Sequence, residues 1–188
     1  MMLFLVRHGQ TDWNLKGKIQ GSRDIELNDT GIKQAEELSE KLLAENYRFA
    51  KIYSSFQKRA AKTAEIISKI TNVDYILIDG LQEMNLGEWE GLSWAEVKDK
   101  YPIEYEEWFV NRRYPKTPKG ESYQDMLDRV LAAIHKIINE NNKNVIVVTH
   151  GAVIMSIQCY LTNTPFDEMT KFKTDNGSII EIESSLFE

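Results

Sequence analysis

Short apolar runs alternate along the chain with longer segments of helical period, and this alternation constrains the fold more than any other feature. Four apolar runs bounded by polar residues predict buried strands: residues 3–6, 51–54, 75–78 and 145–149. A fifth, alternating run at residues 178–183 predicts an edge strand. Apolar side chains at helical spacing predict helices over residues 28–42, 59–70, 122–139 and 152–161. Strands that alternate with helices predict a three-layer α/β/α sandwich with a mostly parallel central sheet.

Residues 81–123 break this alternation. They contain Trp89, Trp94, Trp108 and Phe109 among many charges, and no strand pattern is visible. Since long connections with structure of their own are usually functional, we expect a mainly helical, lid-like excursion over the site. We expect its aromatic residues to line a substrate pocket and to pack the lid. The 188 residues are otherwise expected to form one domain.

Composition excludes several classes of protein. A hydrophobic content of 42% and a charged content of 28% argue against disorder, collagen and coiled coil. A net charge of −6 argues against nucleic acid and anionic membranes as partners, because both require a cationic surface. The single cysteine, Cys159, lies in the apolar helix and is interpreted as a buried small hydrophobe. The apolar start is too short for a signal peptide, so we expect a cytoplasmic protein.

Two of the three histidines stand in the same context. His8 and His150 each follow a very apolar strand and precede a glycine, which lets a ligand approach the backbone closely. In open α/β sheets, ligands bind beyond the carboxyl ends of the strands. The third histidine, His135, lies on the flank of an amphipathic helix and is interpreted as structural. The pattern therefore predicts a site that contains His8 and His150.

Two arginines lie in locally unfavourable places. Arg7 is adjacent to His8 at a strand end, where an unpaired guanidinium is costly unless an anion pairs with it. Arg59 stands at a predicted helix start, where the helix dipole disfavours a cation. Together they indicate an anionic ligand.

The sequence around Arg7, His8 and Gly9 resembles the histidine phosphatase superfamily, which includes the cofactor-dependent phosphoglycerate mutases. The resemblance begins with Leu5-Val6-Arg7-His8-Gly9 and continues in the family's order through most of the chain: residues 10–14, 20–27, 29–31, 59–64, 81–84, 87–91, 120–122 and 148–151. One departure is that the family usually has Pro or Asp and then Leu where this chain has Phe56 and Gln57.

The resemblance implies a role for each matching residue. His8 would be the nucleophile that forms a phosphohistidine, and Glu83 would protonate the leaving oxygen and then activate water. The phosphoryl oxygens would be held by Arg7, Arg59 and His150. Further substrate contacts would come from Asn14, Gln20, Gly21 and Gly151. No metal is implied, because arginine and histidine supply the positive charge that phosphoryl transfer needs.

Three functions remain open. We favour a phosphomonoesterase acting on a small-molecule phosphate ester, since the chain resembles the short phosphatase branch, such as α-ribazole-5′-phosphate phosphatases and broad-specificity phosphatases. The second possibility is a mutase that uses 2,3-bisphosphoglycerate as cofactor, but the mutases are generally longer. The third possibility is a non-catalytic phosphate-binding module.

The basic run Arg112-Arg113-Tyr114 argues for a mutase rather than a phosphatase, because mutases use cations there for the substrate carboxylate. We include Arg113 among the substrate-binding candidates, although a solvated loop also explains the run. The sequence determines neither the substrate nor the oligomeric state, so a dimer stays open.

Overall fold

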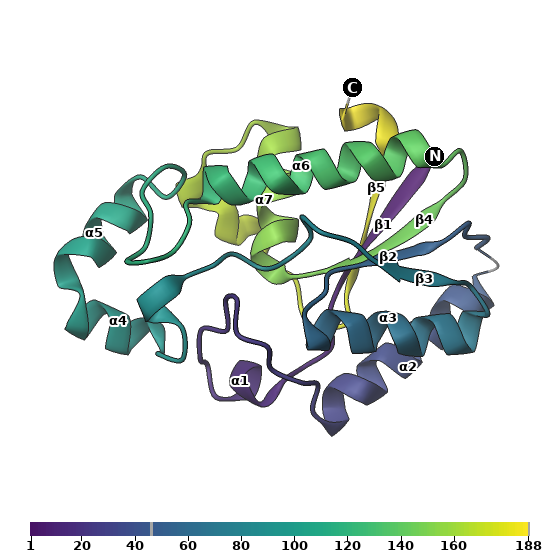
Figure 1. Ribbon diagram of the computed structural model, residues 1–188, viewed down its shortest axis with the longest axis horizontal. Coiled ribbons are helices and arrows are strands. Elements are labelled where there is room, and N and C mark those ends of the chain that lie inside the picture. Colours follow the sequence, from purple (N-terminus) through teal and green to yellow (C-terminus); the bar gives the residue numbers. More distant parts are fainter. Residues whose placement is uncertain (46, 188) are drawn as a thin grey trace.

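A computed structural model describes residues 1–45 and 47–187 and contains one five-stranded sheet (Figure 1). The strand order is β3-β2-β4-β1-β5. The strands are β1 (Met2–Arg7), β2 (Ile52–Ser54), β3 (Tyr75–Leu77), β4 (Val145–Thr149) and β5 (Ile179–Glu183). The first four run parallel, and β5 pairs antiparallel with β1 at one edge. The predicted mostly parallel sheet with a fifth strand at its edge is confirmed.

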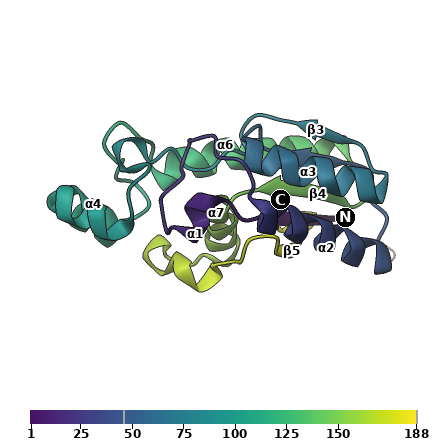
Figure 2. The same ribbon diagram turned by 90° about the horizontal axis from the view of Figure 1, so that it is seen from below.

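Helices cover both faces of the sheet, as the three-layer prediction requires (Figures 1 and 2). On one side lie α2 (Asp29–Ala44) and α3 (Lys58–Thr71), and on the other α6 (Tyr123–Glu140) and α7 (Gly151–Thr162). Successive strand side chains point to opposite faces, so Phe4 and Val6 join the core under α2 and α3. Leu3 and Leu5 join the core under α6 and α7.

The helices begin where polar residues cap them. The Asn28 side chain accepts a hydrogen bond from the Gly31 N–H at the start of α2. Ser122 and Asp125 form a reciprocal capping box at the start of α6. His150 occupies the N-cap position of α7 without a capping bond from its side chain. This last helix start therefore lies directly at the end of β4.

The prediction of a buried strand near residue 75 is wrong in one respect. The strand β3 exists, but Tyr75, Ile76 and Leu77 are 37–38% exposed. The reason is that β3 is the outermost strand on its side of the sheet, a position that composition alone does not reveal.

Residues 81–123 extend beyond one end of the sheet and contain no strand (Figure 1). They include the 3₁₀ turn η1 (Gly87–Trp89) and helices α4 (Trp94–Lys100) and α5 (Pro102–Val110), joined by loops. Trp89 and Trp108 are buried edge to face, with ring centroids 5.4 Å apart. Three short elements complete the fold: α1 (Asp12–Leu15), η2 (Phe166–Phe172) and η3 (Ser184–Phe187). Within the described residues, every helix is too short or too polar to cross a bilayer.

Candidate active site

The site begins at the carboxyl ends of two adjacent strands. In the pairing of β1 with β4, Arg7 stands opposite Thr149, so the next residues, His8 and His150, emerge side by side. The His8 N–H donates to the Thr149 carbonyl at 3.0 Å. The two imidazole ring centroids lie 5.2 Å apart. The two His-Gly pairs therefore meet, as their identical sequence contexts predicted.

His8 is buried and held in one tautomer. Its Nδ1 lies 2.7 Å from the Gly9 carbonyl oxygen. A carbonyl only accepts, so Nδ1 carries the proton and Nε2 keeps its lone pair. Burial, followed by the positive charge of Arg59, holds the pKa of His8 well below its ordinary value. The imidazole is thus neutral at pH 7, and its Nε2 carries the free lone pair.

Arg59 stands at the first turn of α3 and is 1% exposed. It donates from Nε to His8 Nε2 at 3.2 Å, from Nη1 to the Arg23 carbonyl at 2.7 Å and from Nη2 to the Gly21 carbonyl at 2.9 Å. Burial lowers the pKa of Arg59 to about 10, against the raising effect of Glu83. At pH 7 the guanidinium is still a cation.

Arg7 brings a second, partly buried guanidinium to the same place. Its Nη1 donates to the Thr174 carbonyl, and its buried Nε has no hydrogen-bond partner. Gly151 allows this placement, because a Cβ there would lie 3.3 Å from Arg7 Nε. Neither Arg7 nor Arg59 forms an ion pair with a carboxylate in the described part of the chain. One buried and one partly buried cation without paired carboxylates are suited to bind an anion.

His150 lies behind this cluster and is fully buried. Its Nε2 is 2.9 Å from the Ser55 hydroxyl, whereas its buried Nδ1 has no partner. Burial, followed by the charge of Arg59, lowers the pKa of His150 well below its ordinary value. A neutral histidine with one free ring nitrogen is therefore available next to the arginines.

Glu83 faces the same centre from the loop after β3. Its Oε1 accepts from the Met84 N–H at 3.0 Å and its Oε2 from the Ala152 N–H at 3.2 Å. The Ala152 N–H belongs to the first turn of α7, whose positive dipole end favours a carboxylate. The carboxyl group is therefore oriented by the same helix start that carries Gly151.

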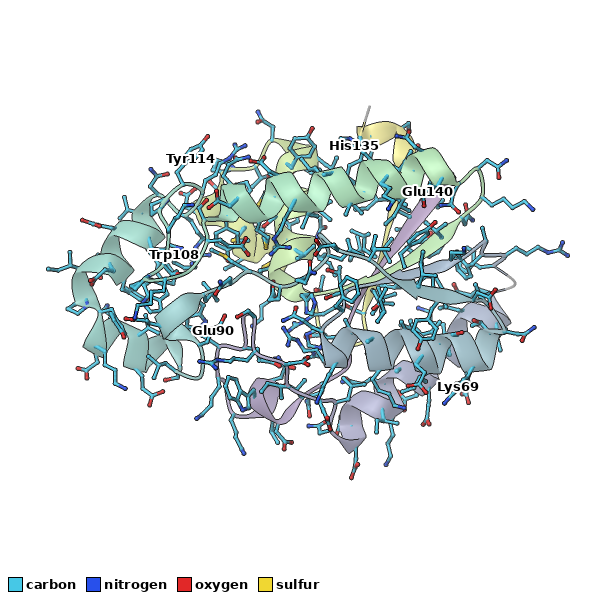
Figure 3. The ribbon with its side chains drawn as sticks, in the orientation of Figure 1. Lys69, Glu90, Trp108, Tyr114, His135 and Glu140 are labelled. Carbon is cyan, nitrogen blue, oxygen red and sulfur yellow. The ribbon has the colours of Figure 1, made fainter. Side chains whose placement is uncertain are left out.

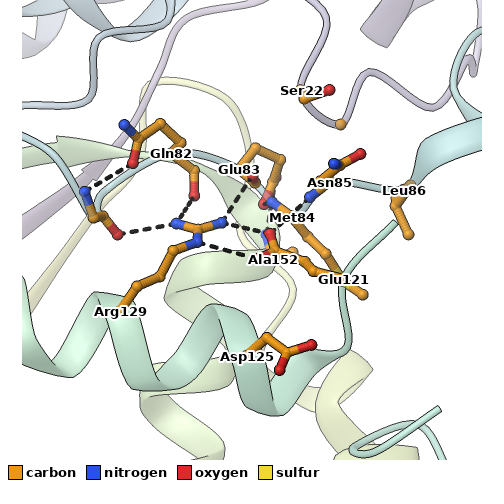
Figure 4. A network of polar contacts seen from close by, with 12 residues as sticks. Ser22, Gln82, Glu83, Met84, Asn85, Leu86, Glu121, Asp125, Arg129 and Ala152 are labelled. Carbon is orange, nitrogen blue, oxygen red and sulfur yellow. Dashed lines mark hydrogen bonds and ion pairs between the residues drawn. The ribbon is translucent and has the colours of Figure 1, made fainter. Parts of the chain in front are cut away.

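The backbone around Glu83 is anchored by α6 (Figure 4). Arg129 donates to the carbonyls of Gly80, Gln82 and Glu83 at 2.8–3.1 Å. It also forms a two-pronged ion pair with Glu121, with contacts at 2.6 and 3.2 Å. One guanidinium thus holds three backbone carbonyls of the loop that carries Glu83. Sequence reasoning missed Arg129, because no local pattern marks a contact 46 residues away.

Arg7, His8, Arg59 and Glu83 line a cavity of about 610 Å³ between the sheet end and residues 81–123, whereas His150 and Arg129 do not reach its surface. Its polar end is formed by Arg7, His8, Asn14, Gln20, Gly21, Arg59, Glu83 and Gly151. The opposite wall is mostly aromatic and contains Trp13, Trp94, Tyr105, Trp108, Phe109 and Tyr123. Trp94, Trp108 and Phe109 therefore line the pocket, as expected. In the described residues no cluster of three or more His, Cys, Asp or Glu side chains could hold a metal ion.

Arg113 does not line this cavity, and its substrate contact stays a prediction. Its Nε donates to Gln124 at 2.6 Å, and it faces a separate hollow near Phe166. The adjacent Arg112 reaches the cavity instead, 8% exposed, stacked on the Phe109 ring at 4.3 Å and with its buried Nε unpartnered. Both follow the end of α5, where successive side chains point in different directions.

The residues interpreted as structural lie apart from the cavity lining. His135 sits on α6 with Nε2 3.0 Å from the Phe187 carbonyl, near the C-terminal end of the chain (Figure 3). Cys159 is buried in α7, and burial raises the pKa of its thiol to about 11. It is therefore a packed side chain rather than a nucleophile.

Three comparisons with known proteins agree with this geometry. The family model described as "Histidine phosphatase superfamily (branch 1)" matches residues 3–185. The chain is 37% identical over 163 residues to a metal-independent phosphoserine phosphatase of Arabidopsis thaliana, covering 85% of this chain and 68% of that one.

Solved structures are similar throughout. The Bacillus stearothermophilus protein YhfR superposes with a TM-score of 0.88 and 30% identity, covering 97% of this chain and 90% of that chain. A phosphoserine phosphatase variant from Entamoeba histolytica in complex with phosphoserine gives a TM-score of 0.83 and 32% identity, covering 96% and 89%. The same Entamoeba enzyme has also been solved with 3-phosphoglyceric acid.

Proposed function

The chain belongs to the histidine phosphatase superfamily, and on that premise we propose that it hydrolyses small phosphomonoesters through a phosphohistidine on His8. The observation that carries the proposal is the hydrogen bond from His8 Nδ1 to the Gly9 carbonyl, with the lone pair of the neutral Nε2 left as nucleophile. Relatives named as phosphoserine phosphatases support hydrolysis over the mutase alternative.

The first half-reaction transfers the phosphoryl group to the enzyme. His8 Nε2 attacks phosphorus in line, the bond from phosphorus to the ester oxygen breaks, and protonated Glu83 gives its proton to that oxygen. In the second half-reaction the Glu83 carboxylate takes a proton from water. The resulting oxygen attacks phosphorus, the N–P bond breaks, and phosphate leaves. Together the two half-reactions return His8 to its unphosphorylated form and Glu83 to its protonated form.

The positive charge for both steps comes from side chains. Arg7 and Arg59 present forked donors to the equatorial phosphoryl oxygens, and His150 adds a ring nitrogen. Asn14, Gln20 and the Gly21 backbone lie at the same end of the cavity. This set is suited to phosphoryl transfer without a metal ion. The Arabidopsis relative is likewise named a metal-independent phosphatase.

We propose that the preferred substrate carries a second anionic group, such as a carboxylate. Arg112 supports this, because it lines the cavity, is buried, and leaves Nε unpartnered. The Entamoeba relative has been solved with phosphoserine and with 3-phosphoglyceric acid, both of which combine a phosphate with a carboxylate.

The test combines trapping with a substrate panel. Rapid acid-free quenching with ³²P-labelled substrate should label wild-type protein at an acid-labile, base-stable bond, and His8→Ala should lose both the label and p-nitrophenyl phosphate hydrolysis. Circular dichroism should show that this variant is folded. Substantial hydrolysis by His8→Ala would sink the nucleophile assignment. Rapid interconversion of phosphoglycerates in the presence of 2,3-bisphosphoglycerate would instead establish the mutase reaction.

A further inference from the structure

Gln57 is a buried amide in a place where its residue type is unusual. It occupies the N-cap position of α3, yet its side chain makes no capping hydrogen bond. Asn28 and Ser122 at the corresponding positions of α2 and α6 do cap their helices. Gln57 is 8% exposed, so its amide has to find partners elsewhere in the protein.

Both partners are backbone groups of the active site. Gln57 Oε1 accepts from the Glu83 N–H at 2.7 Å, and Gln57 Nε2 donates to the Gly21 carbonyl at 2.9 Å. The orientation of the amide is unambiguous, because the reverse would set oxygen against oxygen and N–H against N–H. The Gln57 side chain thus joins the backbone at Glu83, 26 residues later in the sequence, to the backbone at Gly21, 36 residues earlier.

The Gly21 carbonyl has a second donor, Arg59 Nη2, at 2.9 Å. Gln57 and Arg59 therefore donate to the same oxygen, and the other end of the Gln57 amide binds the Glu83 N–H. Arg129 fixes the carbonyl of Glu83 from the other side, but its own hydrogen bonds go to residues 80–83 and 121. Glu90 also bridges the segments of Gly21 and Glu83, through the N–H groups of Ser22 and Leu86, but Gln57 makes its contact at the backbone of Glu83 itself.

We propose that Gln57 is a positioning residue that sets the distance between the Glu83 carboxyl and the phosphoryl group bound by Arg59. The inference rests on the proposed role of Glu83 as general acid. Leucine, an apolar side chain of similar size, could make neither hydrogen bond.

The test uses the dependence of the first half-reaction on the leaving group. An alkyl phosphate needs a proton on its departing oxygen, whereas p-nitrophenolate leaves without one. The measured quantity is kcat/KM, since it covers the steps up to departure of the leaving group and excludes hydrolysis of the phosphoenzyme. For Gln57→Leu we expect about a 10-fold loss on phosphoserine and less than a 2-fold loss on p-nitrophenyl phosphate. Equal losses on both substrates, or no loss on either, would overturn the proposal.

Three further variants make the result decisive. Gln57→Met should reproduce the selective loss if Gln57→Leu does not fold, as judged by its melting temperature. Gln124→Leu removes an amide outside the cavity and should leave both kcat/KM values unchanged. Glu83→Gln should show the same selectivity as Gln57→Leu with a larger loss. If Glu83→Gln is not selective, the acid assignment fails; if only the Gln57 variants are not selective, the positioning inference alone fails.

Discussion

Arg59 Nε donates a hydrogen bond to His8 Nε2 at 3.2 Å, so a cation holds the lone pair that would attack phosphorus. A protonated Nε2 could not accept this bond, and the contact therefore selects the neutral imidazole. The bond must be exchanged for one to a phosphoryl oxygen when substrate enters. In the proposed mechanism Arg59 would keep the His8 imidazole neutral in the free enzyme and would stabilise the transferred group in the transition state.

Arg59→Lys tests this double role. Lysine keeps the charge but cannot reach His8, Gly21 and Arg23 together, as the guanidinium fork does. We expect kcat/KM for p-nitrophenyl phosphate to fall by about 100-fold or more, the usual cost of one misplaced transition-state donor. Lys62→Met, on the exposed side of the same helix, should retain full activity. Near-normal activity of Arg59→Lys would contradict this double role.

The two buried histidines predict how stability depends on pH. Burial lowers the pKa of both His8 and His150 in the folded protein, whereas in the unfolded chain a histidine has its ordinary value of about 6.5. Below pH 6.5 the unfolded chain therefore binds protons that the folded protein excludes, so the free energy of unfolding decreases as pH falls. Each histidine contributes a slope of up to about 1.4 kcal/mol per pH unit.

Urea unfolding between pH 6.5 and 5 checks this slope. His150→Asn removes one of the two groups and should flatten the pH dependence relative to wild type. The same two proteins compared between pH 7.5 and 8.5 form the control, because both histidines are then neutral in either state. Parallel curves for wild type and His150→Asn in the acidic range would show that His150 is not buried as a neutral group.

The sequence predicted the frame of the site because the two decisive signals are local. Apolar strands ending in His8-Gly9 and His150-Gly151 reveal both the histidines and their place at the sheet end. The place of Arg7 and Arg59 in the site was predicted from their locally unfavourable positions and from the family resemblance. Gln57 and Arg129 could not be found this way, since the backbone groups that they bind lie 26 to 49 residues away in sequence. Arg112 and Arg113 are adjacent, and only the turn after α5 decides which one faces the cavity.

Arg129 is expected to stabilise the fold as well as the loop of Glu83. Its side chain and that of Glu121 are 27% and 19% exposed, and their closest N–O distance is 2.6 Å. Arg129→Met would leave the Glu121 carboxylate with only the Asn85 N–H as donor and three backbone carbonyls without the guanidinium. We expect a loss of about 2–3 kcal/mol in the free energy of unfolding, measured in urea.

The pair Lys69–Glu65 offers a matched control, since its N–O distance is also 2.6 Å but the lysine is 69% exposed. Lys69, which points outward from α3 in Figure 3, should be replaceable by Met without a measurable change in stability. Similar losses for both substitutions would mean that burial does not distinguish the two ion pairs.

The adjacent Arg112 and Arg113 give the sharpest test of substrate selection. Arg112 lines the cavity with an unpartnered Nε, whereas Arg113 donates to Gln124 and faces another hollow. For Arg112→Met we expect kcat/KM to fall about 10- to 100-fold on phosphoserine, because the carboxylate loses a charge-assisted donor in a partly desolvated site. Hydrolysis of p-nitrophenyl phosphate, which has no second anion, should change less than 3-fold. Arg113→Met should affect neither substrate selectively, and the reverse pattern would assign the carboxylate contact to Arg113 after all.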